Sequence, residues 1–103
     1  MKTRITELFG INYPIICGGM LWLSTPTLCA AISNAGGLGN ITAANYDTGE
    51  ELRQAIREAK KLTDKPIGVN ITLLPSFRIT EQTYDDYFQV CCEEKVTAIE
   101  VSG

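Results

Sequence analysis

The chain has no histidine, so the side chain that most often acts as a general acid or base near neutral pH is missing from its 103 residues. Basic residues are not in excess, because 9 lysines and arginines stand against 12 acidic residues and leave a net charge of −3. We therefore expect no nucleic-acid partner. No apolar run approaches the roughly 20 residues that a membrane-spanning helix needs, so we expect no membrane insertion either.

The cysteine pattern excludes two further classes. Cys17, Cys29, Cys91 and Cys92 lack the paired spacing of a zinc site. The first apolar run is interrupted by Pro14 and two glycines, unlike the core of a secretory signal. We expect four reduced thiols in a cytoplasmic protein.

The most informative segment is residues 14–20, with the sequence PIICGGM. A short apolar run that ends at two glycines is typical of a buried strand in a parallel sheet. Folds of the α/β class bind their ligands at the carboxyl ends of such strands. Gly18 and Gly19 carry no Cβ, so a flat ligand can lie against their main chain. The alternative interpretation is an ordinary turn from strand to loop.

Helix and strand signals alternate along the rest of the chain. Thr25, Thr48 and Thr80 each precede a segment with helical periodicity and can cap its first turn. Residues 36–39, GGLG, follow a helix and open a strand, which is the reverse of a dinucleotide-binding loop. We interpret them as a helix stop with close packing of helix on strand. The predicted strands are the run that ends at Gly18, and residues 38–42, 67–74 and 96–101, with Pro75 after the third.

Each predicted helix has an apolar face that we expect to be buried. The three faces are Leu28, Ala31, Ile32 and Ala35; Leu52, Ala55, Ile56, Ala59 and Leu62; and Tyr84, Tyr87, Phe88 and Cys91. The resulting order is β-α-β-α-β-α-β with right-handed crossovers. It fits either a small open doubly wound sheet or the first half of an eight-stranded barrel. Because an isolated sheet of four parallel strands leaves two unpaired edges, we favour the half-barrel, as a single partial domain over residues 1–103.

Asn70 is the polar exception within the third predicted strand. Burying an amide without partners costs a few kcal/mol. If Ile67 and Val69 pack to one side, the two-residue period puts Gly68 and Asn70 on the other, toward the barrel interior. An amide there can donate to and accept from a heterocycle. The alternative is a structural hydrogen bond to neighbouring backbone.

Four segments in order resemble one family. They are residues 14–20 (PIICGGM), 33–39 (SNAGGLG), 62–75 (LTDKPIGVNITLLP) and 96–103 (VTAIEVSG). Together they resemble the amino-terminal part of the FMN-dependent nitronate monooxygenases, formerly called 2-nitropropane dioxygenases. The related FMN-type enoyl-acyl-carrier-protein reductases share the pattern.

The resemblance implies a TIM barrel, the (β/α)8 fold, with FMN at its carboxyl face. By its motifs, Gly18, Gly19 and Met20 would lie against the isoalloxazine ring and Asn70 would contact the flavin. Family members usually have glutamine where this chain has Cys17. The family's catalytic histidine lies beyond the end of this chain, so no catalytic residue is assigned within it.

The resulting functional hypothesis is a flavin-dependent oxidoreductase that oxidises alkyl nitronates with O2. The first alternative is the enoyl-acyl-carrier-protein reductase activity. The second is a non-catalytic half-barrel that self-associates into a homo-oligomer through its exposed sheet edges.

Overall fold

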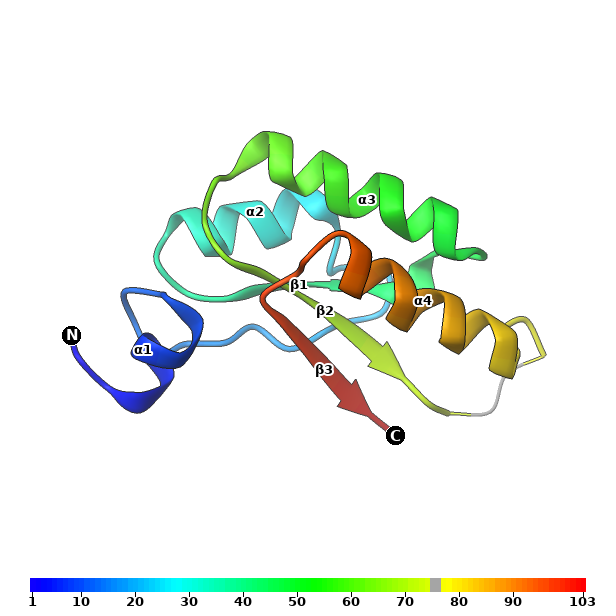
Figure 1. Cartoon of the computed structure of the whole chain (residues 1–103). Helices are drawn as coiled ribbons and strands as arrows, with labels where there is room; N and C mark the ends of the chain where they lie inside the picture. The colour runs from blue at the N-terminus through cyan, green and yellow to red at the C-terminus, as the bar shows by residue number, and fades with distance from the viewer. Residues whose placement is uncertain (75–76) are drawn as a thin grey trace.

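The computed structural model describes residues 1–74 and 77–103, and in these ranges it shows a three-stranded parallel sheet with helices packed on one face (Figure 1). The predicted α/β class is therefore confirmed, although three strands are formed in these ranges and not the predicted four. The elements are α1 (Arg4–Phe9), α2 (Pro26–Asn34), β1 (Gly39–Thr42), the 3-10 turn η1 (Ala43–Asn45), α3 (Gly49–Leu62), β2 (Ile67–Thr72), α4 (Glu81–Glu93) and β3 (Ala98–Ser102).

The sheet has the order β1-β2-β3, and both pairings are parallel. Helix α3 connects β1 to β2 and helix α4 connects β2 to β3, so each connection is a β-α-β crossover. Thr42 pairs with Asn70, and Asn70 pairs with Glu100. The carboxyl ends of the three strands therefore meet at one edge of the sheet. Pro75, which we expect to follow β2, lies outside the described residues.

The predicted first strand was wrong. Residues 14–17 form no strand and join the sheet through one parallel bridge between Ile16 and Leu38. Two backbone hydrogen bonds make this bridge, from Cys17 N–H to Leu38 O and from Leu38 N–H to Ile15 O. Ile15 is 62% exposed. A buried parallel strand needs cover on both faces, and the described residues leave most of this side chain uncovered.

Helix α1 was not predicted. Thr3 and Thr6 form a reciprocal capping box at its start, and Gly10 follows its end with φ +70°. Both are ordinary boundary signals. The helix has only six residues, so it lacks the apolar period that identified the longer ones.

The core lies between the sheet and the helices. Ile67, Val69 and Ile71 of β2 are buried against α3 and α4. The predicted faces of these two helices are confirmed, except that Leu62 at the end of α3 is exposed. In α4, Tyr87 and Cys91 are buried, whereas Tyr84 and Phe88 are partly exposed and pack against the core.

The prediction for α2 was wrong in its orientation. Cys29, Ala30 and Ser33 are buried, whereas Ala31 and Ala35 are exposed. Alanines occur around the helix, so the pattern did not fix which side would face the sheet. The predicted close packing of helix on strand is confirmed at Gly39, where a Cβ would lie 2.2 Å from the carbonyl oxygen of Cys29.

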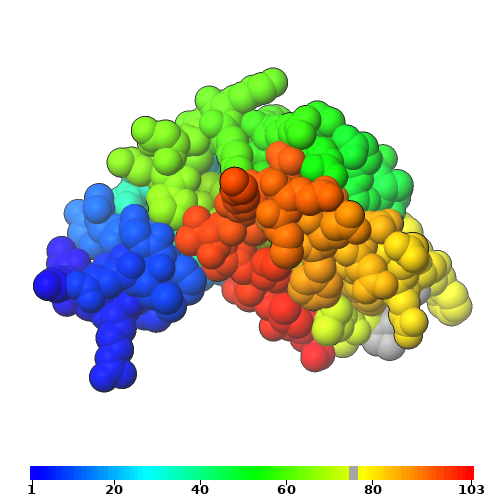
Figure 2. All heavy atoms as spheres, viewed as in Figure 1, coloured from blue at the N-terminus to red at the C-terminus, as the bar shows by residue number. Residues whose placement is uncertain are grey.

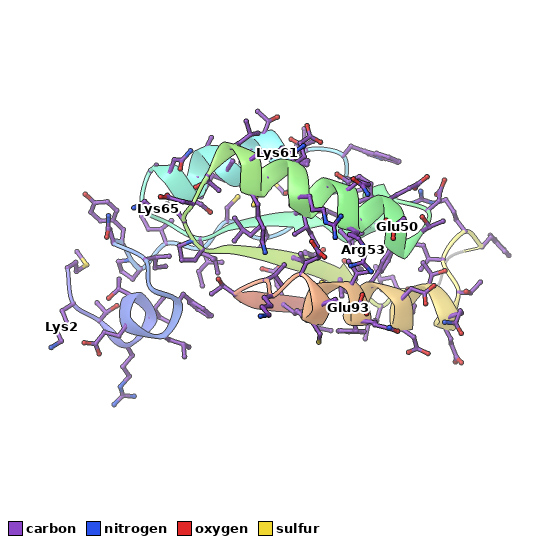
Figure 3. The ribbon with its side chains drawn as sticks, turned by 45° about the horizontal axis from the view of Figure 1, so that its top comes forward. Lys2, Glu50, Arg53, Lys61, Lys65 and Glu93 are labelled. Carbon is purple, nitrogen blue, oxygen red and sulfur yellow. The ribbon has the colours of Figure 1, made fainter. Side chains whose placement is uncertain are left out.

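An ion-pair cluster joins α3 to α4. The Arg53 guanidinium, whose side chain is 19% exposed, contacts Glu50 at 3.0 Å, Glu93 at 2.6 Å and Glu94 at 2.9 Å. Figure 3 shows Arg53 of α3 directed toward Glu93 of α4. Hydrogen bonding to Arg53 lowers the pKa of Glu93. The cluster therefore ties the two crossover helices together across their exposed seam.

The opposite side of the molecule carries the amino-terminal segment and β3. Figure 2 shows both at the side away from α3. The described ranges contain no helix of the length and apolarity required to cross a bilayer.

Candidate functional site

The sheet has one apolar face and one polar face. Side chains alternate along each strand, so Gly68 and Asn70, which flank the buried Val69 in β2, point away from the helices. The registers align these outward positions across the sheet, pairing Asn40 with Gly68, Asn70 with Glu100 and Thr72 with Ser102. The predicted two-sided use of β2 is thus confirmed: isoleucine and valine enter the core, and Asn70 lies on the other face.

The glycine turn lies directly on this polar face. A Cβ on Gly19 would be 2.3 Å from Cβ of Asn70, so no larger residue fits there without movement. The main-chain N–H of Gly19 donates to Glu100 Oε1 at 3.0 Å. The structure therefore brings the turn together with Asn70. The close contact with Asn70 also explains why position 19 is a glycine, whether or not a ligand binds.

Asn70 is 2% exposed and well bonded within the protein. Its amide nitrogen donates to Glu100 Oε1 at 2.8 Å and to Ser102 Oγ at 3.2 Å. Its carbonyl oxygen accepts from Thr72 Oγ1 at 3.2 Å. An amide group has two donors and two acceptor lone pairs, so the remaining capacity of Asn70 is one lone pair on Oδ1. The amide nitrogen also lies 3.4 Å from the main-chain oxygen of Glu100, a longer bond to neighbouring backbone. Side-chain partners therefore hold this amide more closely than the backbone does.

Met20 is held to the end of β1 by its main chain. Its N–H donates to Ser24 Oγ at 2.7 Å, and its carbonyl oxygen accepts from Thr42 Oγ1 at 3.2 Å. Thr42 is the register partner of Asn70, so the three predicted turn residues converge with Asn70 at one sheet edge. The side chain of Met20 remains 41% exposed beside the turn.

A cavity of about 320 Å³ opens at this edge, at the carboxyl ends of β1 and β2. Small-molecule sites occupy roughly 300–1,000 Å³ and combine apolar walls with a few polar groups. This cavity has that composition. It is lined by Gly19, Leu21, Thr42, Ala44, Asn70, Thr72, Leu74, Arg78 and Ile79.

Two loops meet beside the cavity through Trp22 and Arg78. The Arg78 guanidinium lies 5.8 Å from the centre of the Trp22 ring and forms an ion pair with Asp47 at 2.7 Å. The main-chain N–H of Trp22 donates to Asn45 Oδ1 at 2.7 Å. Trp22 has φ +69°, a left-handed conformation that a bulky residue rarely adopts. These contacts hold the segment after the glycine turn against the loops that follow β1 and β2.

Glu100 is the site residue that our sequence reasoning missed. It accepts hydrogen bonds from both Gly19 and Asn70, yet it lies 81 residues from the first of them. One signal was available. Alternation along the last strand places Glu100 and Ser102 on the same face, at the carboxyl end where ligand contacts were expected.

Comparisons with known proteins identify the family of the chain. The family model described as nitronate monooxygenase matches residues 2–102. A nitronate monooxygenase of Pseudomonas aeruginosa is 54% identical over 71 residues, which cover 69% of this chain and 20% of that protein. An octahydroindene-carboxyl-CoA dehydrogenase of Rhodococcus jostii is 48% identical over 71 residues, with the same two coverages.

Among solved structures, FabK from Thermotoga maritima superposes with a TM-score of 0.85 at 46% identity. The match covers 98% of this chain and 30% of that one. The chain thus spans about a fifth of the length of these curated relatives and under a third of the FabK chain. Because the family model extends over nearly every residue, the chain belongs to the nitronate monooxygenase family.

Proposed function

We propose that residues 1–103 are one partial domain, the first part of an FMN-binding TIM barrel, and that the complete protein is an FMN-dependent nitronate monooxygenase. The observation that carries the proposal is the glycine turn packed on Asn70 at the carboxyl ends of parallel strands. Ligands of α/β folds bind at that end. The nitronate monooxygenase and FabK families are flavin-dependent in general, and FMN is the form that we propose here.

The residues present fit a flat, polar ring. Gly18 is exposed and Gly19 lines the cavity, so a ring can approach their main chain without meeting a side chain. Met20 and Leu21 are exposed apolar side chains next to that surface. Asn70 offers its spare Oδ1 lone pair. When bound, FMN would take electrons from the nitronate substrate and transfer them to O2.

In this proposal, residues 1–103 orient the flavin ring and exclude water from one side of the cavity. Arg78 lines the cavity and lies against the Trp22 ring, and the main chain of Met20 is fixed by Ser24 and Thr42. No histidine occurs among the 103 residues, so we assign no proton-transfer step to this part of the protein.

Flavin binding and turnover of the complete protein test the proposal. We expect a yellow protein with an ordered-flavin absorbance spectrum and oxygen consumption upon addition of an alkyl nitronate. Asn70→Ala should weaken FMN binding, whereas Asn12→Ala, an exposed asparagine outside the cavity, should not. A colourless protein that also fails to bind added FMN would contradict the proposal.

The similarity to FabK supports a second candidate, the FMN-type enoyl-acyl-carrier-protein reductase activity. The two activities differ in their substrates. Oxidation of NADH that depends on an enoyl thioester, without oxygen consumption on a nitronate, would favour the reductase.

A third candidate is the self-associating half-barrel. Within the described residues β3 pairs on one side only, and Val101 in it is exposed. Unpaired strand edges promote association between chains. Light scattering of the purified 103-residue chain distinguishes a colourless oligomer from a flavin-binding monomer.

A further inference from the structure

The carboxylate of Glu100 uses its two oxygens unequally. Oε1 accepts from the Gly19 N–H at 3.0 Å and from the Asn70 amide at 2.8 Å. Within residues 1–74 and 77–103, no hydrogen bond reaches Oε2. A carboxylate oxygen accepts about two hydrogen bonds. Oε2 therefore retains its acceptor capacity, while Oε1 holds the scaffold.

This oxygen lies against the turn that we propose to face the flavin. Oε2 is 3.4 Å from the position that a Cβ on Gly18 would occupy, nearer than the other atoms of Glu100. Gly18 is exposed, and its N–H makes no hydrogen bond to any described residue. An unused charged acceptor and an unused donor thus belong to two residues in contact.

The chemistry of such a pair selects one edge of a flavin. A carboxylate repels carbonyl oxygens and phosphate but binds an N–H group strongly. Oxidised isoalloxazine carries a single ring N–H, at N3, flanked by two carbonyl groups. That imide edge offers a donor beside an acceptor, which complements Glu100 Oε2 beside Gly18 N–H.

We propose that Glu100 Oε2 accepts the hydrogen bond from N3–H of the bound flavin, with Gly18 N–H donating to the neighbouring ring carbonyl. The inference rests on the proposed function, because it requires a flavin on the glycine turn, beside the cavity that Gly19 and Asn70, the two donors to Glu100 Oε1, line. It assigns the orientation of the ring and gives Glu100 two separate tasks, one for each oxygen.

Glu100→Gln separates these tasks. The single amide oxygen of glutamine can retain both hydrogen bonds that Oε1 now accepts. The NH2 group takes the place of Oε2, so two donors face each other and the hydrogen bond from the ring N–H is lost. The probes are FMN and FMN methylated at N3, titrated into the complete protein. Methylation should weaken binding to the natural protein more than binding to Glu100→Gln, by about tenfold or more, the worth of one hydrogen bond to a charged group.

A second measurement is independent of affinity. Removing a negative charge beside the pyrimidine ring favours the electron-rich reduced flavin, so Glu100→Gln should make the reduction potential of bound FMN more positive. Glu58→Gln, which removes an exposed carboxylate on α3, is the matched control and should leave the potential unchanged.

The outcomes are distinguishable. If N3 methylation weakens both proteins equally and the potential does not move, the role of Glu100 is overturned while FMN binding stands. If the natural protein binds neither flavin, the proposed function fails and this inference fails with it.

Discussion

Replacing Gly19 by alanine tests the contact on which the site depends. The new Cβ would lie 2.3 Å from Cβ and 2.4 Å from Cγ of Asn70, which is buried and bonded on both sides of its amide. Overpacking of this kind costs about 1–3 kcal/mol. The shift also strains the bond from the Gly19 N–H to Glu100, and a hydrogen bond to a charged group contributes about 1.5–3 kcal/mol. We expect the free energy of unfolding to fall by about 2–4 kcal/mol.

Gly18→Ala is the matched control, because its Cβ would meet Glu100 at 3.4 Å, an ordinary contact. Neither glycine has a positive φ, so alanine is compatible with both backbones. Both substitutions also restrict the unfolded chain by a similar amount, about 0.4–1 kcal/mol, which cancels in the comparison. Urea denaturation followed by the fluorescence of the single tryptophan, Trp22, measures the difference. Equal stability of the two variants would refute the packing argument.

Three further predictions follow from other contacts. Arg53→Met should destabilise the protein at neutral pH, and the loss should shrink in acid. The reason is that the hydrogen bond from Arg53 lowers the pKa of Glu93 in the folded state. The stability that this ion pair contributes is complete above the pKa of a free glutamate and disappears as the pH falls through the pKa of Glu93 in the folded protein. Denaturation at several pH values checks this. Burial raises the pKa of Cys91 to about 12, so iodoacetamide near pH 8 should label the exposed Cys92 and spare Cys91. Peptide mass spectrometry measures the labelling of each cysteine, and rapid labelling of both would contradict the burial of Cys91. Thr48→Ala should lower stability by about 1 kcal/mol because its hydroxyl caps α3, whereas Thr48→Ser should retain the cap and the stability.

Local signals predicted much of the fold correctly. Thr25, Thr48 and Thr80 cap their helices through their side chains, as the sequence indicates. A cap depends on residues two or three positions away, so its chemistry is complete within the local sequence. The alternation of Val69 and Asn70 between the two faces of β2 was also predicted correctly, because it depends only on the two-residue period of the strand itself.

The errors involve distant partners. The run at Ile15 and Ile16 has the composition of a buried strand, but a strand forms only where neighbours pair with it and cover it. The orientation of α2 was ambiguous because alanine is small enough for either side of the helix. Glu100 escaped notice because its partners approach it only after the crossover through α4 has formed.

The hydrogen-bond network around Asn70 has a consequence for how a ligand is recognised. Its rotamer and amide direction are set by Glu100, Ser102 and Thr72 during folding. Freezing a side chain at the moment of association costs about 0.5–1.5 kcal/mol in conformational entropy, and this face avoids that loss. The site is therefore preorganised, so an incoming molecule meets a rigid template whose shape does not depend on its arrival.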